Sequence, residues 1–515
     1  MQINQNQKKI GIILSYAAQA IQMLSGLIYT PIMLRLLGQN EFGLFQLAHS
    51  VVAYLGLLSF GFASSYLRFY SRFKAKDEQN EIAKLNGMFM SIFFVISTVC
   101  ILCGMLMVGN IEILFAGGLT QDEYHMARIL MLIMVFNIAL TFPNSVFNSF
   151  TSAHERFVFQ RLLVVLQSLF NPFITLPLLL LGYGAIGMVA VTTALTLSKL
   201  IANVWYSLKI LKIKFVFKGF KFSLFKEMWA FTFFIFIELI ANQLNWGIGK
   251  LLLGRFIGTV AVAIYGVAAQ LIIMYLQFSA VISSVFAPKV NRIVAESNDN
   301  EQLTQLFTKV GRIQFVVLSL IISGFIFMGR AFIEMWAGTE YTVSYEVALL
   351  LMIPITIPLI QNLGVEIQRA KNKHRDRSIV YLCAGICNVL VSIPLIHRFG
   401  VIGAAMGTGM SFLLGNGLFM NWYYHKRIGM DIIYFWKQIG RILPALIAPV
   451  ILGILIVRFS LIVGLISFVS LGIVYVFVFC ISMWFIGLNQ MERELISKPM
   501  ARIKQSLIKK CKKGR

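Results

Sequence analysis

Stretches of about twenty apolar residues recur along the whole chain, and they limit its fold more than any other feature. A bilayer core about 30 Å thick needs ~20 apolar residues per helix, and by this rule fourteen stretches qualify as membrane spans. The chain is 58% hydrophobic and only 13% charged, so it has more apolar surface than one soluble core can bury. The predicted fold class is an all-α integral membrane protein with about 14 transmembrane helices. Their expected positions are residues 10–34, 44–66, 85–109, 125–149, 160–181, 184–208, 227–249, 260–287, 310–329, 345–367, 378–396, 400–424, 439–457 and 461–487.

The lysine and arginine residues predict which side of the membrane each connection faces. Of the 45, 37 lie at the N-terminus, in every second connection and in the C-terminal tail, whereas the intervening connections hold 7 and Lys199 lies within a span. Cytoplasmic connections are enriched in these residues, so both termini are expected in the cytoplasm. The net charge of +24 thereby has a topological explanation, and no nucleic-acid partner is expected.

Two segments recur later in the chain at nearly constant spacing. Residues 37–48 return at 257–268, and residues 183–187 return at 399–403, with offsets of 220 and 216. Six predicted spans separate the copies, and an even number of spans returns the chain to the same side of the membrane. The pattern predicts two six-helix lobes in parallel pseudo-repeat around a cavity, plus two C-terminal helices, as in secondary transporters built from internal repeats. The expected organisation is an N-lobe at 1–208 (spans 1–6), a cytoplasmic basic linker at 209–226, a C-lobe at 227–425 (spans 7–12), spans 13–14 at 426–488 and a basic cytoplasmic tail at 489–515.

The connections between the spans leave little room for catalysis. The outer connections are short, and the sequence lacks the Gly-x-x-x-x-Gly-Lys-Ser/Thr loop that holds ATP phosphates. Five of the six cysteines lie within apolar stretches, which favours core packing over a metal site. We therefore expect a transporter rather than an enzyme, with no cofactor and no metal, and with H⁺ or Na⁺ as the candidate coupling ion.

Three spans carry polar residues at helical spacing. The fourth span includes Asn144 and Asn148, the seventh includes Asn242 and Asn245, and the first has a similar row of glutamines. Unpaired polar groups in hydrocarbon cost several kcal/mol, so these residues should face protein or water. The rows either line a hydrophilic path or make hydrogen bonds between helices.

Lys199 and Glu238 are ionisable residues placed near the middle of their predicted spans. An intramembrane charge is a functional hypothesis by default, because it costs at least ~2.5 to 3.5 kcal/mol to insert. Lys199 is expected to be a cation in the cavity, and Glu238 either its counter-charge or a proton or sodium site. The alternatives are a structural ion pair between them or a lysine that reaches the interface. His49, within the second span, is expected to be a packed neutral histidine.

Further cations stand at the ends of spans. They are Arg35, Arg68, Lys250, Arg255 and Arg369. Such residues either anchor the helix ends to lipid headgroups or, where they face inward, dock a phosphate-bearing substrate.

The opening of the chain resembles a known family of transporters. The matching segments are residues 31–45, PIMLRLLGQNEFGLF, and residues 60–69, FGFASSYLRF. They are similar to the start of polysaccharide transporters, the Wzx-type flippases of O-antigen, capsule and exopolysaccharide repeat units. That family belongs to the multidrug, oligosaccharidyl-lipid and polysaccharide exporter superfamily, and the twelve-plus-two span plan extends the resemblance to the whole chain.

The resemblance implies two lobes around a cationic cavity that work by alternating access. It implies a bacterial cytoplasmic (inner) membrane location and a substrate of oligosaccharide units on undecaprenyl pyrophosphate, moved from the inner to the outer leaflet. Membrane lipids, a polysaccharide polymerase and a chain-length regulator are the implied partners. Arg35 and Arg68 lie within the matching segments, whereas Lys199 and Glu238 are nominated by depth alone.

Three other functions remain as alternatives. A cation-coupled multidrug antiporter shares the two-lobe fold, but such proteins usually have twelve spans and depend on membrane carboxylates. A lipid II flippase has fourteen spans, and no motif in the first span separates it from the present chain. A membrane polysaccharide polymerase or ligase would need a sizeable outer loop with catalytic groups, which the predicted topology lacks.

Overall fold

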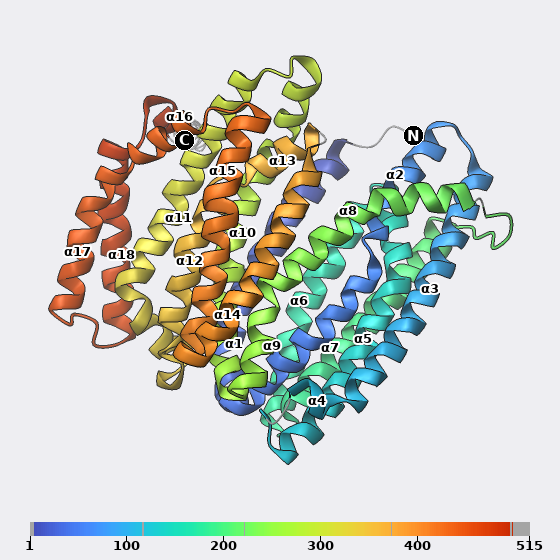
Figure 1. The fold of residues 1–515 in the computed structure, drawn as a ribbon, viewed down its shortest axis with the longest axis horizontal. Coiled ribbons are helices and arrows are strands. Elements are labelled where there is room, and N and C mark those ends of the chain that lie inside the picture. Colours follow the sequence, from blue (N-terminus) through green and yellow to red (C-terminus); the bar gives the residue numbers. More distant parts are fainter. Residues whose placement is uncertain (1–4, 116–117, 221, 372, 495–496, 498–515) are drawn as a thin grey trace, which may run out of the picture. The chain divides into compact units, whose positions relative to one another are not determined.

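The computed structural model describes residues 5–115, 118–220, 222–371, 373–494 and 497, and these residues form helices and connections with no strand (Figure 1). Among these residues, ten helices are long and apolar enough to cross a membrane, or eleven if one bent pair counts as a single span. The predicted all-α membrane fold is therefore confirmed in its class. Most of the predicted tail at 489–515 lies outside the described residues.

The number of helices that pass this test is smaller than the number of predicted spans, mainly because some neighbouring spans are joined in one continuous helical stretch. The apolar stretches Ala17–Ala75 and Asp376–Ile428 each contain two predicted spans. The tenth predicted span corresponds to Ser344–Ile360 and Leu363–Ala370, which are bent by 43°. Each predicted span overlaps a helix, while fourteen separate spans stay a prediction.

Glycines with positive φ mark the turns that the sequence repeats. Gly38 has φ 72° and its repeat partner Gly258 has φ 123°, whereas Gly184 and its partner Gly400 have φ 52° and 60°. Glycine adopts this region readily, because it has no Cβ atom. Gly38 and Gly400 interrupt otherwise continuous helices, so the repeated motifs are helix breaks that separate neighbouring spans.

The helices form two compact units. The first consists of Met1–Ala269 and Arg375–Ser411, and the second of Gln270–His374 and Phe412–Arg515. The first unit therefore contains the whole predicted N-lobe and part of the predicted C-lobe.

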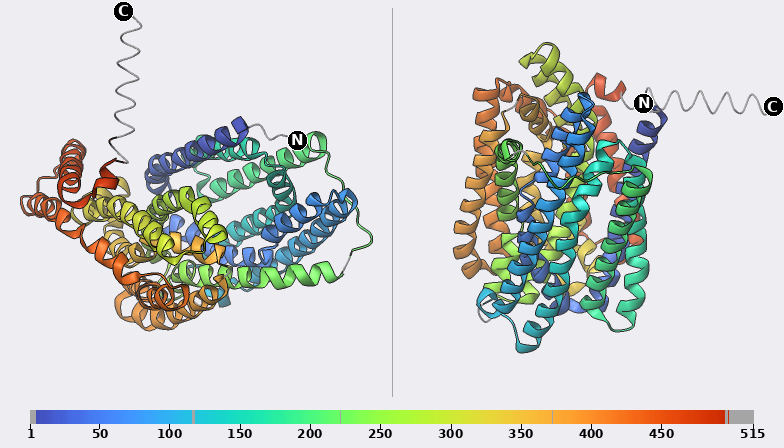
Figure 2. Two further views of the ribbon diagram at one scale, coloured as in Figure 1. Left: turned by 90° about the horizontal axis from the view of Figure 1, so that it is seen from above. Right: turned by 90° about the vertical axis from the view of Figure 1, so that its right-hand side faces the viewer.

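In the first unit, α3, α5 and α7 run side by side, with α1 and α6 packed beside them (Figures 1 and 2). Helix α5 starts at Thr120, whose hydroxyl accepts from the backbone N–H of Glu123, while Glu123 Oε2 accepts from the N–H of Thr120. This capping box satisfies two N–H groups at the helix end. The elements of this unit are α1 (Gln5–Val52), η1 (Ala53–Ser59), α2 (Phe62–Ala75), α3 (Gln79–Gly109), α4 (Ile111–Phe115), α5 (Gln121–Ala153), α6 (Phe157–Leu180), α7 (Gly184–Trp205), η2 (Tyr206–Ile210), α8 (Phe222–Trp246), α9 (Ile248–Phe256), the start of α10 (Thr259–Glu296) and most of α14 (His374–Phe412).

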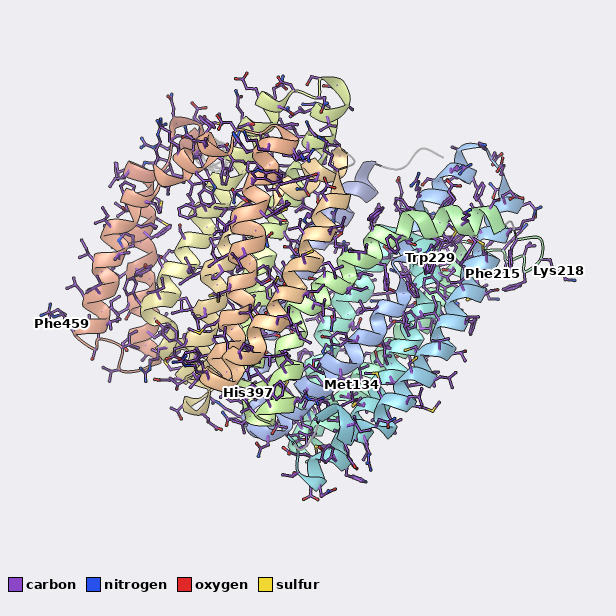
Figure 3. The ribbon with its side chains drawn as sticks, in the orientation of Figure 1. Met134, Phe215, Lys218, Trp229, His397 and Phe459 are labelled. Atoms are coloured by element: carbon purple, nitrogen blue, oxygen red, sulfur yellow. The ribbon has the colours of Figure 1, made fainter. Side chains whose placement is uncertain are left out.

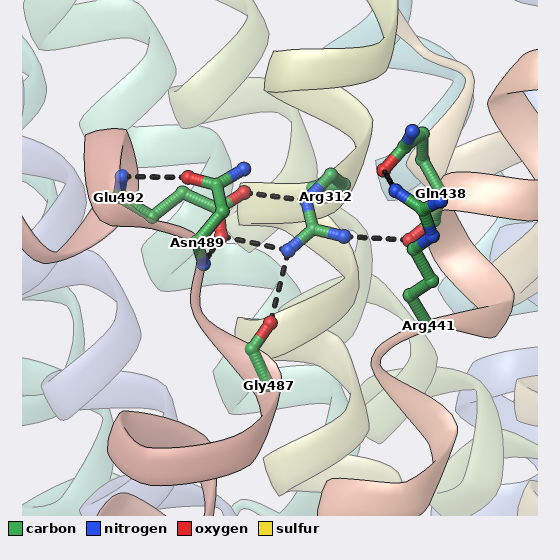
Figure 4. Close-up of polar contacts among 6 residues, drawn as sticks. All are labelled: Arg312, Gln438, Arg441, Gly487, Asn489 and Glu492. Carbon is green, nitrogen blue, oxygen red and sulfur yellow. Dashed lines mark hydrogen bonds and ion pairs between the residues drawn. The ribbon is translucent and has the colours of Figure 1, made fainter.

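In the second unit, a buried ion pair fixes the segment that follows the last long helix. Arg312 and Glu492 are 5% and 4% exposed, with Nε and Oε1 2.6 Å apart (Figure 4). Arg312 also donates to the carbonyl oxygens of Gln438 and Gly487, at 2.6 and 2.9 Å. The remaining helices of this unit are α11 (Asn300–Trp336), α12 (Ser344–Ile360), α13 (Leu363–Ala370), α15 (Met420–Tyr423), α16 (Ile432–Gly440), α17 (Ile447–Arg458) and α18 (Leu465–Ser482), joined by η3 (Thr339–Tyr341), η4 (Leu413–Phe419), η5 (Tyr424–Ile428), η6 (Leu443–Leu446) and η7 (Met483–Gly487).

Candidate functional site

Helices α5 and α7 of the first unit meet along a row of polar side chains. Asn137 Nδ2 donates hydrogen bonds to the hydroxyl oxygens of Thr193 and Thr196, at 3.0 and 3.2 Å. Two turns further along, Asn203 Nδ2 donates to Asn144 Oδ1 at 2.8 Å. These bonds satisfy side-chain N–H donors of Asn137 and Asn203 within apolar helices.

Lys199 lies on the same side of α7 as this row. Thr192, Thr196, Lys199 and Asn203 follow one another at intervals of four, three and four, so they share one face of a helix with 3.6 residues per turn. The Lys199 side chain is half-buried, and in the described part of the chain its ammonium has no ion pair or hydrogen bond. Its charge is available to an anion.

The same polar row ends at a cavity of about 250 Å³ inside the first unit. Its walls come from α1, η1, α5 and α7, and Met134 marks its position in Figure 3. His49 lies in the wall, with the centre of its ring 6.2 Å from that of Phe45. The lining residues are Phe45, His49, Val52, Ala53, Met134, Asn137, Ile138, Val189 and Thr192.

Lys250 joins α9 to α1 rather than standing free at a helix end. Its Nζ donates to Gln46 Oε1 at 2.9 Å, and the side chain is half-buried. Gln46 lies one turn before His49 on α1. The structure thus brings Lys250, which the sequence suggested only as an end cation, beside the cavity.

Glu238 pairs with Arg377, a residue that the sequence did not single out. The distance from Arg377 Nη1 to Glu238 Oε1 is 3.1 Å, and the guanidinium lies 4.9 Å from the centre of the Tyr381 ring. Of the alternatives for Glu238, the pairing with Lys199 is therefore wrong, because the carboxylate pairs with Arg377 instead. In the sequence, nothing distinguishes Arg377 from the other lysines and arginines of the same connection.

The asparagines of the two rows have different surroundings. Asn245 is buried, donates to the carbonyl oxygen of Ala241 at 2.8 Å and accepts from Ser411 Oγ at 3.2 Å, so it links helices. Asn242 is exposed. Asn148 is also exposed, and its side-chain oxygen accepts from Gln160 Nε2 at 3.1 Å.

The end arginines are exposed at scattered positions. Arg68 lies with its guanidinium carbon 4.6 Å from the centre of the Phe231 ring. Arg255 donates weakly to the carbonyl oxygens of α4, with the shortest distances at 3.5 Å. Arg35 is exposed on α1. Arg369 belongs to the second unit and pairs there with Glu366 at 3.1 Å.

The structure therefore brings together only part of the predicted set of site residues. It brings Lys199 and Asn144 to one seam and Lys250 to the neighbouring cavity. Sequence reasoning missed Thr192, Thr196 and Asn203, although their helical spacing from Lys199 could have revealed them. Within the described ranges, no group of three or more His, Cys, Asp or Glu residues could hold a metal ion.

Comparison with known structures supports the fold. The structure matches the lipid II flippase MurJ in an inward closed conformation with a TM-score of 0.74 and 16% sequence identity, covering 94% of this chain and 100% of that one. An inward-facing multidrug resistance transporter of the MATE family in the MOP superfamily matches with a TM-score of 0.65 and 12% identity, over 82% and 98% of the two chains. At these identities the likeness concerns the fold alone.

Sequence comparison identifies relatives. A capsular polysaccharide biosynthesis protein, CapF, of Staphylococcus aureus is 26% identical over 227 residues, which are 44% of this chain and 56% of that protein. The match thus spans little more than half of the relative. A putative O-antigen transporter of Shigella flexneri is 21% identical over 402 residues, 76% of this chain and 91% of the relative.

One family covers more than half of the chain. Residues 9–294 match the family described as polysaccharide biosynthesis protein. This range includes the breaks at Gly38 and Gly258, the seam around Lys199 and the cavity beside Lys250. The chain belongs to the polysaccharide biosynthesis protein family, as its opening motifs predicted.

Proposed function

We propose that this protein is a flippase for lipid-linked oligosaccharide repeat units in the synthesis of surface polysaccharide. It moves units carried on undecaprenyl pyrophosphate from the inner to the outer leaflet of the bacterial cytoplasmic membrane, by alternating access. A polymerase and a chain-length regulator act on the units after transfer, and H⁺ or Na⁺ supplies the driving gradient.

The observation that carries this proposal is the ammonium of Lys199, which has no partner among the residues that the structure describes. It lies on the polar face of α7, in a helix that passes the length and apolarity test for a membrane span. A cation at this depth costs at least ~2.5 to 3.5 kcal/mol to insert. An anionic group of the substrate offsets that cost, and a pyrophosphate is the strongest anion that a lipid-linked saccharide offers.

The polar seam supplies the second element of recognition. Thr192 of α7 and Asn137 and Asn144 of α5 lie along the seam between these helices, beside Lys199. The hydroxyl and amide groups of these side chains suit neutral sugars, which are recognised by hydrogen bonds. The relatives, a capsular polysaccharide biosynthesis protein and an O-antigen transporter, support the same substrate class.

Complementation of a strain that lacks its own repeat-unit flippase tests the proposal. The unaltered protein restores surface polysaccharide, whereas Lys199→Ala reduces it at least about tenfold, because a lost charge-assisted contact costs ~1.5 to 3 kcal/mol. Lys218→Ala, which removes an exposed lysine of the linker, is the matched control and keeps full activity. Membrane abundance of all variants is measured by immunoblot, and full activity of Lys199→Ala at normal abundance would remove Lys199 from the site.

A further inference from the structure

The segment between α7 and α8 is fixed to α3 by backbone and side-chain contacts. The backbone N–H of Val216 donates to the carbonyl oxygen of Ala83 at 3.0 Å. Asn86 Nδ2 donates to the carbonyl oxygen of Lys214 at 2.9 Å. At Gly87 the two backbones approach so closely that a Cβ atom would clash with the Val216 carbonyl. The segment is therefore held in place on the first unit.

Alternate residues of this segment face the helices and the outside. Ile213 is buried, and the ring of Phe215 lies against Phe147 of α5, with ring centres 6.2 Å apart (Figure 3). Lys214, which stands between them in the chain, is exposed. In an extended chain successive side chains point to opposite sides, so the contacts with α3 and α5 orient the lysine outward.

The segment lies at the level where α3 changes from polar to apolar. Residues 79–86 of α3, QNEIAKLN, include five polar or charged side chains, whereas residues 87–96, GMFMSIFFVI, include one. Helix α3 passes the length and apolarity test for a membrane span, and such a helix makes this change at the boundary between headgroups and hydrocarbon. Two perpendicular views show the segment at the edge of the first unit (Figures 1 and 2). This position corresponds to the bilayer interface.

The outward side of the segment combines cations with apolar side chains. Three lysines are exposed, and among the described residues their ammonium groups have no ion pair or hydrogen bond. Three apolar side chains beside them are 47 to 57% exposed. Lysine side chains can lie along apolar surface and keep their ammonium groups among polar headgroups. We call this set the linker face, and it consists of Leu208, Lys209, Ile210, Lys212, Lys214 and Phe217.

The charge of the linker face determines the kind of partner. Residues 206–226 contain no Asp or Glu, so no acidic side chain of the segment competes with an external anion. On α3, the neighbouring Lys84 is already paired with Glu81 at 2.8 Å. A soluble acidic protein or a nucleic acid would leave the three exposed apolar side chains in water. An anionic phospholipid matches both parts of the surface, because it offers a phosphate next to acyl chains.

We propose that the linker face is a docking surface for anionic phospholipid headgroups of the cytoplasmic leaflet. Its three lysines contact the lipid phosphates, and its three apolar side chains insert among the adjoining acyl chains. Docking fixes the connection between the two sequence repeats to the membrane, beside the start of α8. This inference goes beyond the proposed function and does not depend on which molecule the protein transports.

Native mass spectrometry of the whole protein, titrated in detergent with phosphatidylglycerol or phosphatidylcholine, tests the inference. One variant combines Lys209→Gln, Lys212→Gln and Lys214→Gln. The control combines Lys289→Gln, Lys426→Gln and Lys437→Gln, which removes the same charge from exposed lysines of the second unit. All six side chains are exposed, so both variants are expected to fold, and thermal unfolding in detergent checks this.

The unaltered protein is expected to bind phosphatidylglycerol more tightly than phosphatidylcholine. The linker variant weakens phosphatidylglycerol binding about tenfold, since each lysine near an anionic surface contributes to the attraction. The control variant changes this binding less than about twofold. Phe217→Ala weakens the binding of both lipids, because insertion of an apolar side chain does not depend on the headgroup charge.

Equal affinity for the two lipids, or equal losses in the linker variant and its control, overturns the proposal. Soluble glycerol phosphate distinguishes a lipid from a free phosphate. It is expected not to displace phosphatidylglycerol at equal concentration, and displacement would show that the face binds phosphate without a membrane. Because the titration contains no glycan, a protein that binds phosphatidylglycerol in this way but does not move lipid-linked glycans refutes the proposed function alone.

Discussion

Two cations in the long helices, Arg312 and Lys199, have opposite surroundings. Arg312 is buried, and its guanidinium donates to both carboxylate oxygens of Glu492 and to two carbonyl oxygens. Lys199 is half-buried, and its ammonium makes no such bond in the described part of the chain. The Arg312 pair is satisfied within the protein, whereas Lys199, without a partner among the described residues, is the candidate for binding an anionic ligand.

Arg312→Ala is expected to destabilise the protein by about 3 to 5 kcal/mol, because it leaves the Glu492 carboxylate buried and unpaired. The measurement is thermal unfolding in detergent. The control is Arg330→Ala, which removes an exposed partner of Glu334 and costs no more than about 1 kcal/mol. Equal losses of stability in the two variants would show that burial of the Arg312 pair has no energetic consequence.

The sequence predicted some of these residues and not others for a physical reason. Depth within an apolar run identifies Lys199 and Glu238, because the cost of a charge in hydrocarbon depends on depth. The partner of each charge depends on tertiary contacts. Arg312 meets a glutamate 180 residues away, and Glu238 meets Arg377 instead of Lys199, so neither pairing follows from local spacing.

Among the helices, the repeated glycines have the clearest structural meaning. Gly38 has φ 72° and ψ 174°, a region that is essentially confined to glycine, and it interrupts α1. The hydropathy pattern placed a connection near this residue, and the sequence repeat aligns it with Gly258. Hydropathy does not show whether a break is a loop or one residue, which is why, among the described residues, the helices that pass the test for a membrane span are fewer than the predicted spans.

Gly38→Ala is expected to lower stability by about 1 to 3 kcal/mol through backbone strain alone. A Cβ atom at Gly38 would meet no other atom within 4 Å, and the same holds for Gly109, whose φ is not positive. Gly109→Ala is therefore a matched control, with a change within about ±0.5 kcal/mol. If thermal unfolding gave the same midpoint for both variants, the positive φ at Gly38 would carry no strain.

For the molecule as a whole, apolar spans, biased charges and an internal repeat pointed to a membrane transporter before any contact was known. The family match supports that interpretation, and the MurJ-like and MATE-like fold agrees with the predicted fold class. The predicted lobes do not coincide with the two compact units, because α10 and α14 each run from one unit into the other. The compact units are defined by contacts between helices, whereas the predicted lobes follow from a repeat in the sequence. The two ways of dividing the chain need not agree.

The most direct measurement follows a pyrophosphate-linked glycan across the bilayer of liposomes that contain the purified protein. A membrane-impermeant glycan-modifying enzyme reports the fraction of glycan in the accessible leaflet over time. The protein is expected to accelerate transfer at least about tenfold over empty liposomes, and Lys199→Ala is expected to lose this acceleration. If the protein instead drove a cationic dye against a proton or sodium gradient and left the glycan in its original leaflet, the chain would be a multidrug antiporter and the flippase assignment would be wrong.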